Sequence, residues 1–80
     1  MILEKVQTII AEKLSIDASS ITLESDLQKD FGADSLDAVE IVMAVEDEFD
    51  LSIDDEDLLE IRTVNDIVQQ IEKRLKAKGN

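Results

Sequence analysis

The segment GADSLDAVE places a serine, Ser35, beside Asp34 and close to Asp37, where a loop is expected to give way to a helix. A serine hydroxyl in such a position can cap the helix, act as a nucleophile or carry a covalently attached group. A nucleophilic serine needs an adjacent base, yet the chain has no histidine, and Lys29, the nearest lysine in sequence, lies among acidic residues. Capping and covalent attachment are therefore the two roles left for this serine.

The chain contains neither histidine nor cysteine. It thus lacks the most common general base, the thiol nucleophile, and the usual nitrogen and sulfur ligands of metals. Disulfide bonds are excluded for the same reason, so apolar packing must stabilise the fold. We expect this chain to be no enzyme and to hold no metal.

Acidic residues are concentrated in one part of the chain. The net charge is -12, and residues 34–60 hold 12 of the 20 acidic residues without one lysine or arginine. Such a charge repels nucleic acid and anionic membranes, while it attracts basic patches on other proteins. The charge pattern therefore predicts basic protein partners, no nucleic acid and no insertion into a membrane.

Length and hydropathy favour a single domain over residues 1–80. A chain of 80 residues buries roughly 60% of the surface that it exposes when unfolded, which is enough for one modest core. No apolar run approaches the roughly 20 residues that a membrane-spanning helix requires, and the N-terminus lacks the apolar block of a signal peptide. We expect a soluble, cytoplasmic monomer.

Two amphipathic helices are predicted near the ends of the chain. Apolar residues recur at helical spacing within residues 2–14 and again within residues 64–75. Thr63 comes just before the second group of apolar residues, and Asp66 follows it by three positions. This spacing is typical of a capping box at the start of a helix. The last turns of this helix are rich in lysine and arginine, which suits the negative end of the helix dipole.

Between these helices, residues 15–34 read as a long loop, and a further helix is expected over 35–49. Gly32 can adopt a positive φ without steric cost, and either Asp34 or Ser35 can then cap the new helix. The loop is expected to be anchored in the core by five apolar side chains: Ile16, Ile21, Leu23, Leu27 and Phe31.

A short helical turn is expected around residues 55–61, with Leu58, Leu59 and Ile61 facing inward. Together these elements predict an all-α fold, namely a small four-helix bundle. It would have three longer helices, one short third helix and a long loop between the first two helices.

The helix over 35–49 carries apolar residues on two sides. At 100° per residue, one side groups the expected core residues Ala38, Ile41, Val42, Val45 and Phe49. The other side carries Leu36, Val39 and Met43 among acidic residues. Exposed apolar residues beside charges are typical of a docking surface, in which burial gives affinity and charge steers the encounter.

The segment GADSLDAVE resembles the phosphopantetheine attachment motif of acyl carrier proteins, and the likeness extends over the whole chain. It covers the amphipathic first helix, the long loop, an acidic helix ending in VEDEFDLSI, a short third helix and a last helix opened by TVNDIV. The type of carrier that it resembles serves bacterial or organellar fatty acid biosynthesis.

This resemblance implies that Ser35 carries a 4'-phosphopantetheine arm, whose thiol holds growing acyl chains as thioesters. The implied partners are a phosphopantetheinyl transferase (holo-acyl-carrier-protein synthase), ketosynthases, acyltransferases and other enzymes of fatty acid synthesis. In the family, residues that follow the serine contact these enzymes. The matching positions in this chain are Asp34, Leu36, Asp37, Val39, Glu40, Met43, Glu46 and Asp47.

Other classes of protein could have the same acidic composition. Peptidyl and D-alanyl carrier proteins share the fold and the modified serine, and they remain alternatives. An acidic mimic of nucleic acid would need the charge but not Ser35. A calcium sensor is disfavoured, because EF-hand loops starting at Asp26 or Asp50 would place Phe31 or Asp55 where the loop requires glycine.

Overall fold

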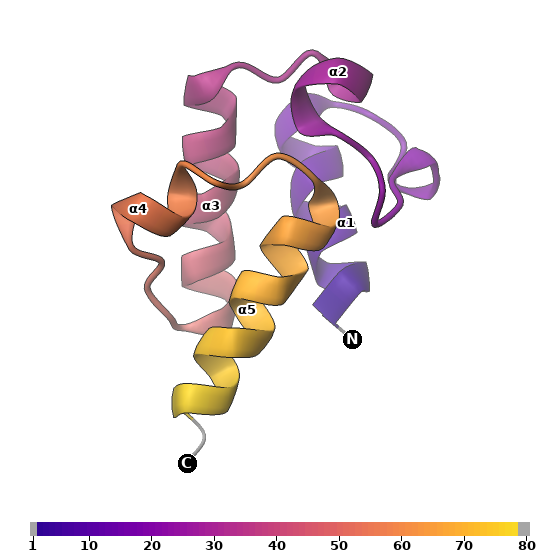
Figure 1. Cartoon of the computed structure of the whole chain (residues 1–80). Helices are drawn as coiled ribbons and strands as arrows, with labels where there is room; N and C mark the ends of the chain where they lie inside the picture. The colour runs from indigo at the N-terminus through magenta and orange to yellow at the C-terminus, as the bar shows by residue number, and fades with distance from the viewer. Residues whose placement is uncertain (1, 79–80) are drawn as a thin grey trace.

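Helices make up the fold of residues 2–78, the part of the chain that this computed structural model describes. The three long helices are α1 (Ile2–Leu14), α3 (Ser35–Phe49) and α5 (Val64–Lys78) (Figure 1). Shorter segments are the 3-10 turn η1 (Ala18–Ser20), α2 (Leu27–Phe31) and α4 (Asp55–Leu58). No strand is formed within residues 2–78, and the predicted all-α class is confirmed.

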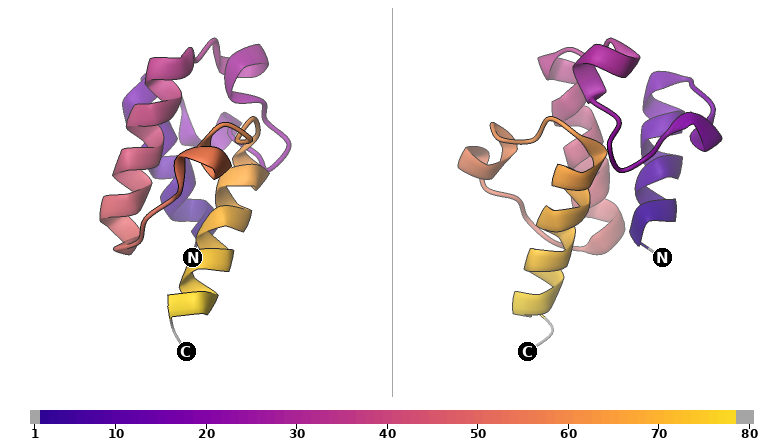
Figure 2. Two further views of the ribbon diagram at one scale, coloured as in Figure 1. Left: turned by 60° about the vertical axis from the view of Figure 1, so that its left-hand side comes forward. Right: turned by 45° about the vertical axis from the view of Figure 1, so that its right-hand side comes forward.

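The long helices enclose one apolar core. In Figure 1, α1 lies behind α3 and α5, and the turned views of Figure 2 show the three helices around a common interior. The expected core positions Ile41, Val42 and Val45 of α3 are buried, while Phe49 packs against them from the edge. Side chains from all three helices are fully enclosed: Val6, Ile10, Ile41, Val45, Ile67 and Ile71.

The segment expected to be a continuous loop contains the short helix α2, so that part of the prediction was wrong. The Asp26 carboxylate accepts hydrogen bonds from the N–H groups of Gln28 and Lys29 at 2.9 and 2.8 Å. Gly32, with φ of 69°, ends the helix in the left-handed conformation. Five residues are too few for helical periodicity, so only these two end signals mark α2 in the sequence.

The anchoring of this segment agrees with expectation at most positions. Ile21 and Leu27 are buried in the core, and Ile16 and Phe31 pack against it. Leu23 is the exception, because 39% of its side chain is exposed. Leu23 lies in a turn, and its backbone carbonyl accepts a hydrogen bond from the N–H of Asn65. Leu23 is therefore linked to α5 through its main chain and not through its side chain.

The short helix α4 ends at Leu58, three residues earlier than expected. Leu58 and Ile61 pack against the core, but the prediction that Leu59 faces inward was wrong, since 85% of it is exposed. Leu59 follows the last turn of α4 and points away from the bundle. Its side chain therefore adds nothing to the core.

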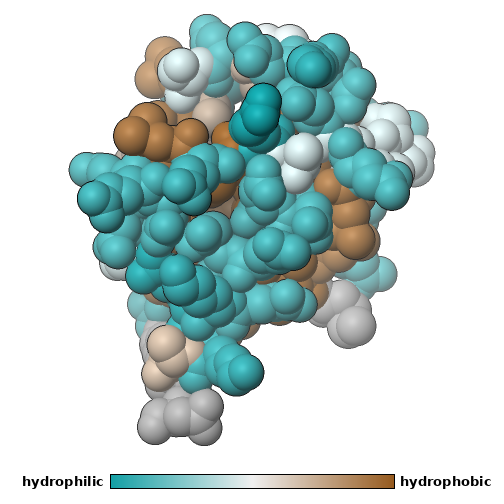
Figure 3. All heavy atoms as spheres, viewed as in Figure 1, coloured by the Kyte–Doolittle hydropathy of each residue, from teal (hydrophilic) through white to brown (hydrophobic). Residues whose placement is uncertain are grey.

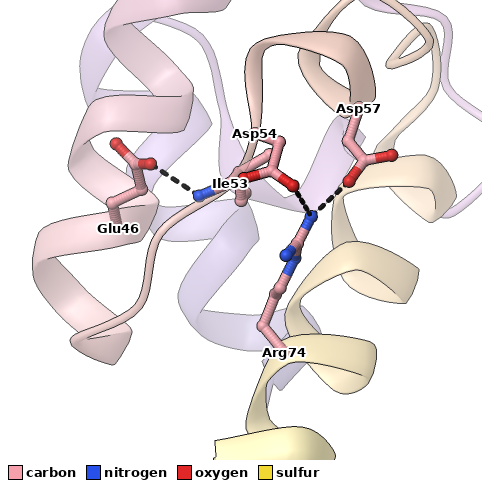
Figure 4. Close-up of polar contacts among 5 residues, drawn as sticks. All are labelled: Glu46, Ile53, Asp54, Asp57 and Arg74. Carbon is pink, nitrogen blue, oxygen red and sulfur yellow. Dashed lines mark hydrogen bonds and ion pairs between the residues drawn. The ribbon is translucent and has the colours of Figure 1, made fainter.

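Polar contacts hold α4 against its neighbours, as Figure 4 shows. Arg74 of α5 reaches Asp54 at 3.5 Å and also pairs with Asp57, and its side chain is only 22% exposed. Glu46 of α3 accepts a hydrogen bond from the N–H of Ile53 at 2.8 Å. Since α4 contains no fully buried residue, these contacts add to the packing of Leu58 in attaching it to the bundle.

The predicted capping box at the start of α5 is confirmed. The Asp66 carboxylate accepts hydrogen bonds from the N–H groups of Arg62 at 2.9 Å and Thr63 at 3.0 Å. The N–H of Asp66 in turn donates to the Thr63 hydroxyl at 3.2 Å. Backbone hydrogen bonds from Leu27 to Arg62 and from Val64 to Ser25 join this end of α5 to the start of α2.

We expect Asp66→Ala to lower the free energy of unfolding by about 0.5–2 kcal/mol at neutral pH, the usual cost of losing a helix cap. Burial raises the pKa of Asp66, but hydrogen bonds from Thr63 and Arg62 outweigh it and hold the pKa below its ordinary 3.8. A carboxyl group whose pKa is lowered on folding stabilises the fold at a pH above its pKa in the unfolded state. This stabilisation is lost as the pH falls through its pKa in the folded state.

The difference in stability between wild type and Asp66→Ala should therefore shrink as the pH falls below the ordinary pKa of 3.8 and through the lower pKa of the folded state. Thermal unfolding at neutral and acidic pH measures it. A difference that stays constant across this range would show that the Asp66 charge does not support the α5 cap.

Candidate functional site

Ser35 is the first residue of α3, and Asp34 is the residue that caps this helix. The Asp34 carboxylate accepts the N–H of Asp37 at 2.9 Å, and the Asp37 carboxylate accepts the N–H of Asp34 at 3.2 Å. This reciprocal pair is a capping box. Since Asp34 performs the capping, that role does not explain the hydroxyl of Ser35.

The loop before Ser35 is fixed by the end of α2. The positive φ of Gly32 turns the chain, and the N–H of Ala33 donates to the carbonyl of Leu27 at 3.0 Å. Ala33 itself is buried, with 5% of its surface exposed. The space around Gly32 would admit a Cβ atom, so the backbone conformation is what favours glycine there.

The Ser35 side chain is exposed at this junction. Across residues 2–78 no hydrogen bond to its hydroxyl is found, so neither a base nor a capping contact engages it. The first backbone N–H groups of a helix lack intrahelical partners and, with the positive end of the helix dipole, favour a nearby phosphate. A phosphate-linked group on Ser35 would therefore lie beside N–H groups that favour its charge.

A cavity of about 190 Å³ opens beside Ser35 between α2, the start of α3 and the segment that precedes α5. Its lining includes apolar Ala38 and Ile61 and the basic residues Lys29 and Arg62. An exposed hydroxyl, free helix amides and an adjoining cavity with apolar and basic walls fit a phosphopantetheine group, which has a phosphate and a slender chain. Ser35 would hold that group through its phosphate.

The outer face of α3 keeps most of the expected docking residues accessible. Leu36 is 65% and Met43 58% exposed, whereas Val39 is half-buried. Glu40 and Asp47 are exposed beside them. The other expected residues have structural contacts as well: Asp34 and Asp37 form the α3 cap, and Glu46 accepts from the backbone of Ile53.

Hydrophilic atoms cover most of the face of the molecule seen in Figure 3, and hydrophobic atoms emerge at its upper left and at its right. No group of three or more potential ligand residues among residues 2–78 is arranged to hold a metal ion. None of the helices described over these residues is both long and apolar enough to cross a membrane.

Reasoning from the sequence missed two residues at this site, Lys29 and Arg62. Both line the cavity beside Ser35 although they are 33 positions apart in a chain of 80 residues. One signal was present, because these are the basic residues that bracket the acidic stretch 34–60. Only the backbone contact between Leu27 of α2 and Arg62, in the segment before α5, shows that they line the same cavity.

Comparison with known proteins agrees with this geometry. Residues 4–71 match the family model described as the phosphopantetheine attachment site. The acyl carrier protein of Thermotoga maritima is 54% identical over 74 residues, which cover 92% of this chain and 91% of that protein.

Solved structures show the same similarity. A crystal structure of an acyl carrier protein from Thermotoga maritima superposes with a TM-score of 0.82 and 35% identity, covering 92% of this chain and 86% of that one. The acyl carrier protein from Enterococcus faecalis gives a TM-score of 0.77 and 37% identity, covering 91% and 92%. With its free serine at the start of α3, the chain belongs to the phosphopantetheine-attachment family and, within it, to the acyl carrier proteins.

Proposed function

We propose that Ser35 carries 4'-phosphopantetheine and that the chain presents acyl groups, held as thioesters, to the enzymes of fatty acid synthesis. The observation that supports this most is the position of Ser35: it is exposed, it opens α3, and Asp34 relieves it of capping. Acyl carrier proteins are carriers rather than enzymes, which suits a chain without histidine or cysteine. The attached arm supplies the thiol that the protein lacks.

In this function the protein would hold the phosphopantetheine arm and present it to partner enzymes. Because no base among the described residues 2–78 contacts Ser35, we expect the attaching enzyme to deprotonate its hydroxyl. Once the phosphodiester is formed, the free N–H groups of α3 stabilise its charge. The loop from Gly32 to Asp34 fixes where the arm starts, so each partner enzyme meets it at the same place on α3.

We further propose that the outer face of α3 docks basic patches on partner enzymes such as the phosphopantetheinyl transferase, ketosynthases and acyltransferases. Leu36 and Met43 offer exposed apolar area, and Glu40 and Asp47 offer charges that form no hydrogen bond or ion pair with side chains described in the structure. Burial of the apolar side chains would give affinity, and the carboxylates would steer the encounter. Of the eight residues proposed to dock, Asp34, Asp37 and Glu46 also form hydrogen bonds that support the fold, and the others would serve docking alone.

We expect Glu40→Lys to slow association with a basic partner by up to about tenfold at low salt and to weaken the dependence of this rate on salt. The fold should hardly change, because substitutions at exposed positions usually cost under about 0.5 kcal/mol. Stopped-flow measurement of binding to a ketosynthase at several ionic strengths provides the rates.

Glu72→Lys is the matched control, since Glu72 is exposed on α5 and the charge change is the same. It should keep nearly wild-type association apart from a small effect of the altered net charge. Equal slowing in both variants would mean that net charge, and not the α3 face, governs docking.

The group that the arm accepts distinguishes an acyl carrier from the peptidyl and D-alanyl carrier proteins that the sequence alone left as alternatives. After attachment of the arm, incubation with malonyl coenzyme A and an acyltransferase should load one malonyl group that hydroxylamine releases, as expected of a thioester. Loading with an amino acid by an adenylating enzyme, without malonyl loading, would favour the alternative. A cytoplasmic location, a monomeric state and a single carrier domain over residues 1–80 stay predictions.

A further inference from the structure

Two unpaired cations line the cavity beside Ser35. They are Lys29 in the middle of α2 and Arg62 before α5, and both side chains are exposed. Within residues 2–78 neither side chain has a hydrogen bond or an ion pair, and the charge of Arg62 acts on Asp66 only at longer range. Elsewhere within residues 2–78, Lys5 pairs with Glu48 and Arg74 with Asp57, whereas Lys13 and Lys73 also form no ion pair, so what distinguishes Lys29 and Arg62 is their place in the lining of the cavity beside Ser35.

The carboxylates that line the same cavity are already engaged by backbone N–H groups. Asp26 accepts from the first turn of α2, and Asp34 accepts from Asp37 in the first turn of α3. These hydrogen bonds hold both carboxylates in place, and neither forms an ion pair with Lys29 or Arg62, although both keep their charge. Lys29 and Arg62 therefore remain available to another anion.

Backbone contacts keep these two residues near Ser35. The carbonyl of Arg62 accepts the N–H of Leu27 at 2.9 Å, and Asp26 and Thr63 form an isolated antiparallel bridge. The N–H of Ala33 donates to the carbonyl of Leu27, which ties the loop before Ser35 to the same helix. Figure 1 shows α2 and the start of α3 at one end of the molecule.

We propose that Lys29 and Arg62 form an anion site that holds the phosphodiester of the arm on Ser35 against the mouth of this cavity. The proposal rests on Ser35 being the attachment residue. An exposed ion pair between separate molecules is weak, but a tethered phosphate is present at high effective concentration, so two cations suffice to bias its position. They would also offset locally the charge that the phosphate adds to an acidic protein.

The test compares wild type with a Lys29→Gln, Arg62→Gln double variant, each before and after loading by an excess of transferase. The quantity compared is the change in melting temperature on loading, that is, the value after loading minus the value before it. At about 0.01 M ionic strength, this change should be about 2–5 °C lower in the double variant than in wild type. This difference should disappear at about 1 M salt. The phosphorus NMR line of the loaded double variant should also be narrower, because its phosphate moves more freely.

A Lys13→Gln, Lys73→Gln double variant is the matched control, since both lysines are exposed and the loss of charge is the same. It should respond like wild type, and Arg62→Lys should retain most of the effect. Single variants at positions 29 and 62 should each show part of it, which keeps the test available if the double variant loads poorly. Identical loading shifts and phosphorus line widths in wild type and every variant would overturn the proposal. Failure of the wild-type chain to load would instead refute Ser35 attachment.

Discussion

Replacing Ile41 by alanine should lower the free energy of unfolding by about 2–5 kcal/mol, the usual cost of truncating a buried isoleucine. Ile41 is fully buried between α3 and the rest of the core. For a domain of this size, the melting temperature should fall by roughly 10–30 °C. Since small domains are stable by only about 5–15 kcal/mol, this single change removes a large share of the total. Thermal and urea unfolding measure it.

Met43→Ala is the companion substitution, two residues further along the same helix. Because 58% of Met43 is exposed, its loss should cost under about 0.5 kcal/mol of stability. Binding to a ketosynthase should nevertheless weaken by about tenfold, because the methionine would be buried only in the complex. If Met43→Ala melted as far below wild type as Ile41→Ala, the two faces of α3 would be assigned wrongly and the docking surface with them.

Helical periodicity is the reason why α1, α3 and α5 could be predicted from the sequence. Each is long enough for its apolar residues to repeat over several turns, and the capping signals at Asp34 and Thr63 mark where two of them begin. The burial of Ile41 and Val45 against the exposure of Met43 follows from the same 100° rotation per residue. The positions of these helices and of their buried faces depend on residues close together in the sequence, and they can therefore be predicted from it.

Features that depend on the packing of distant segments were not predictable in this way. Helix α2 has a single buried residue, Leu27, and α4 has none, so periodicity could not define them. The exposure of Leu59 follows from where α4 stops. Lys29, Ser35 and Arg62 line one cavity because the start of α2 is hydrogen-bonded to the segment before α5, and a contact between such distant segments cannot be read from local pattern.

Substitution of Ser35 by alanine should abolish attachment of the phosphopantetheine arm and leave the fold intact. The side chain is exposed and without a hydrogen bond within the described residues 2–78, so its loss leaves no buried group unsatisfied. Alanine is also a good residue for the first turn of a helix. We expect the melting temperature of the apo protein to change little, as measured by thermal unfolding, while every acyl-transfer reaction is lost.

The most direct test of the account is the intact mass of the chain after incubation with coenzyme A and a phosphopantetheinyl transferase. The wild-type protein should gain the mass of one phosphopantetheine group, and Ser35→Ala should gain nothing. Ser19→Ala, Ser20→Ala and Ser52→Ala serve as controls, since these serines are also exposed, and each should load like wild type. A gain of the same mass by Ser35→Ala, or no gain by the wild-type chain, would contradict the assignment of Ser35 as the attachment site.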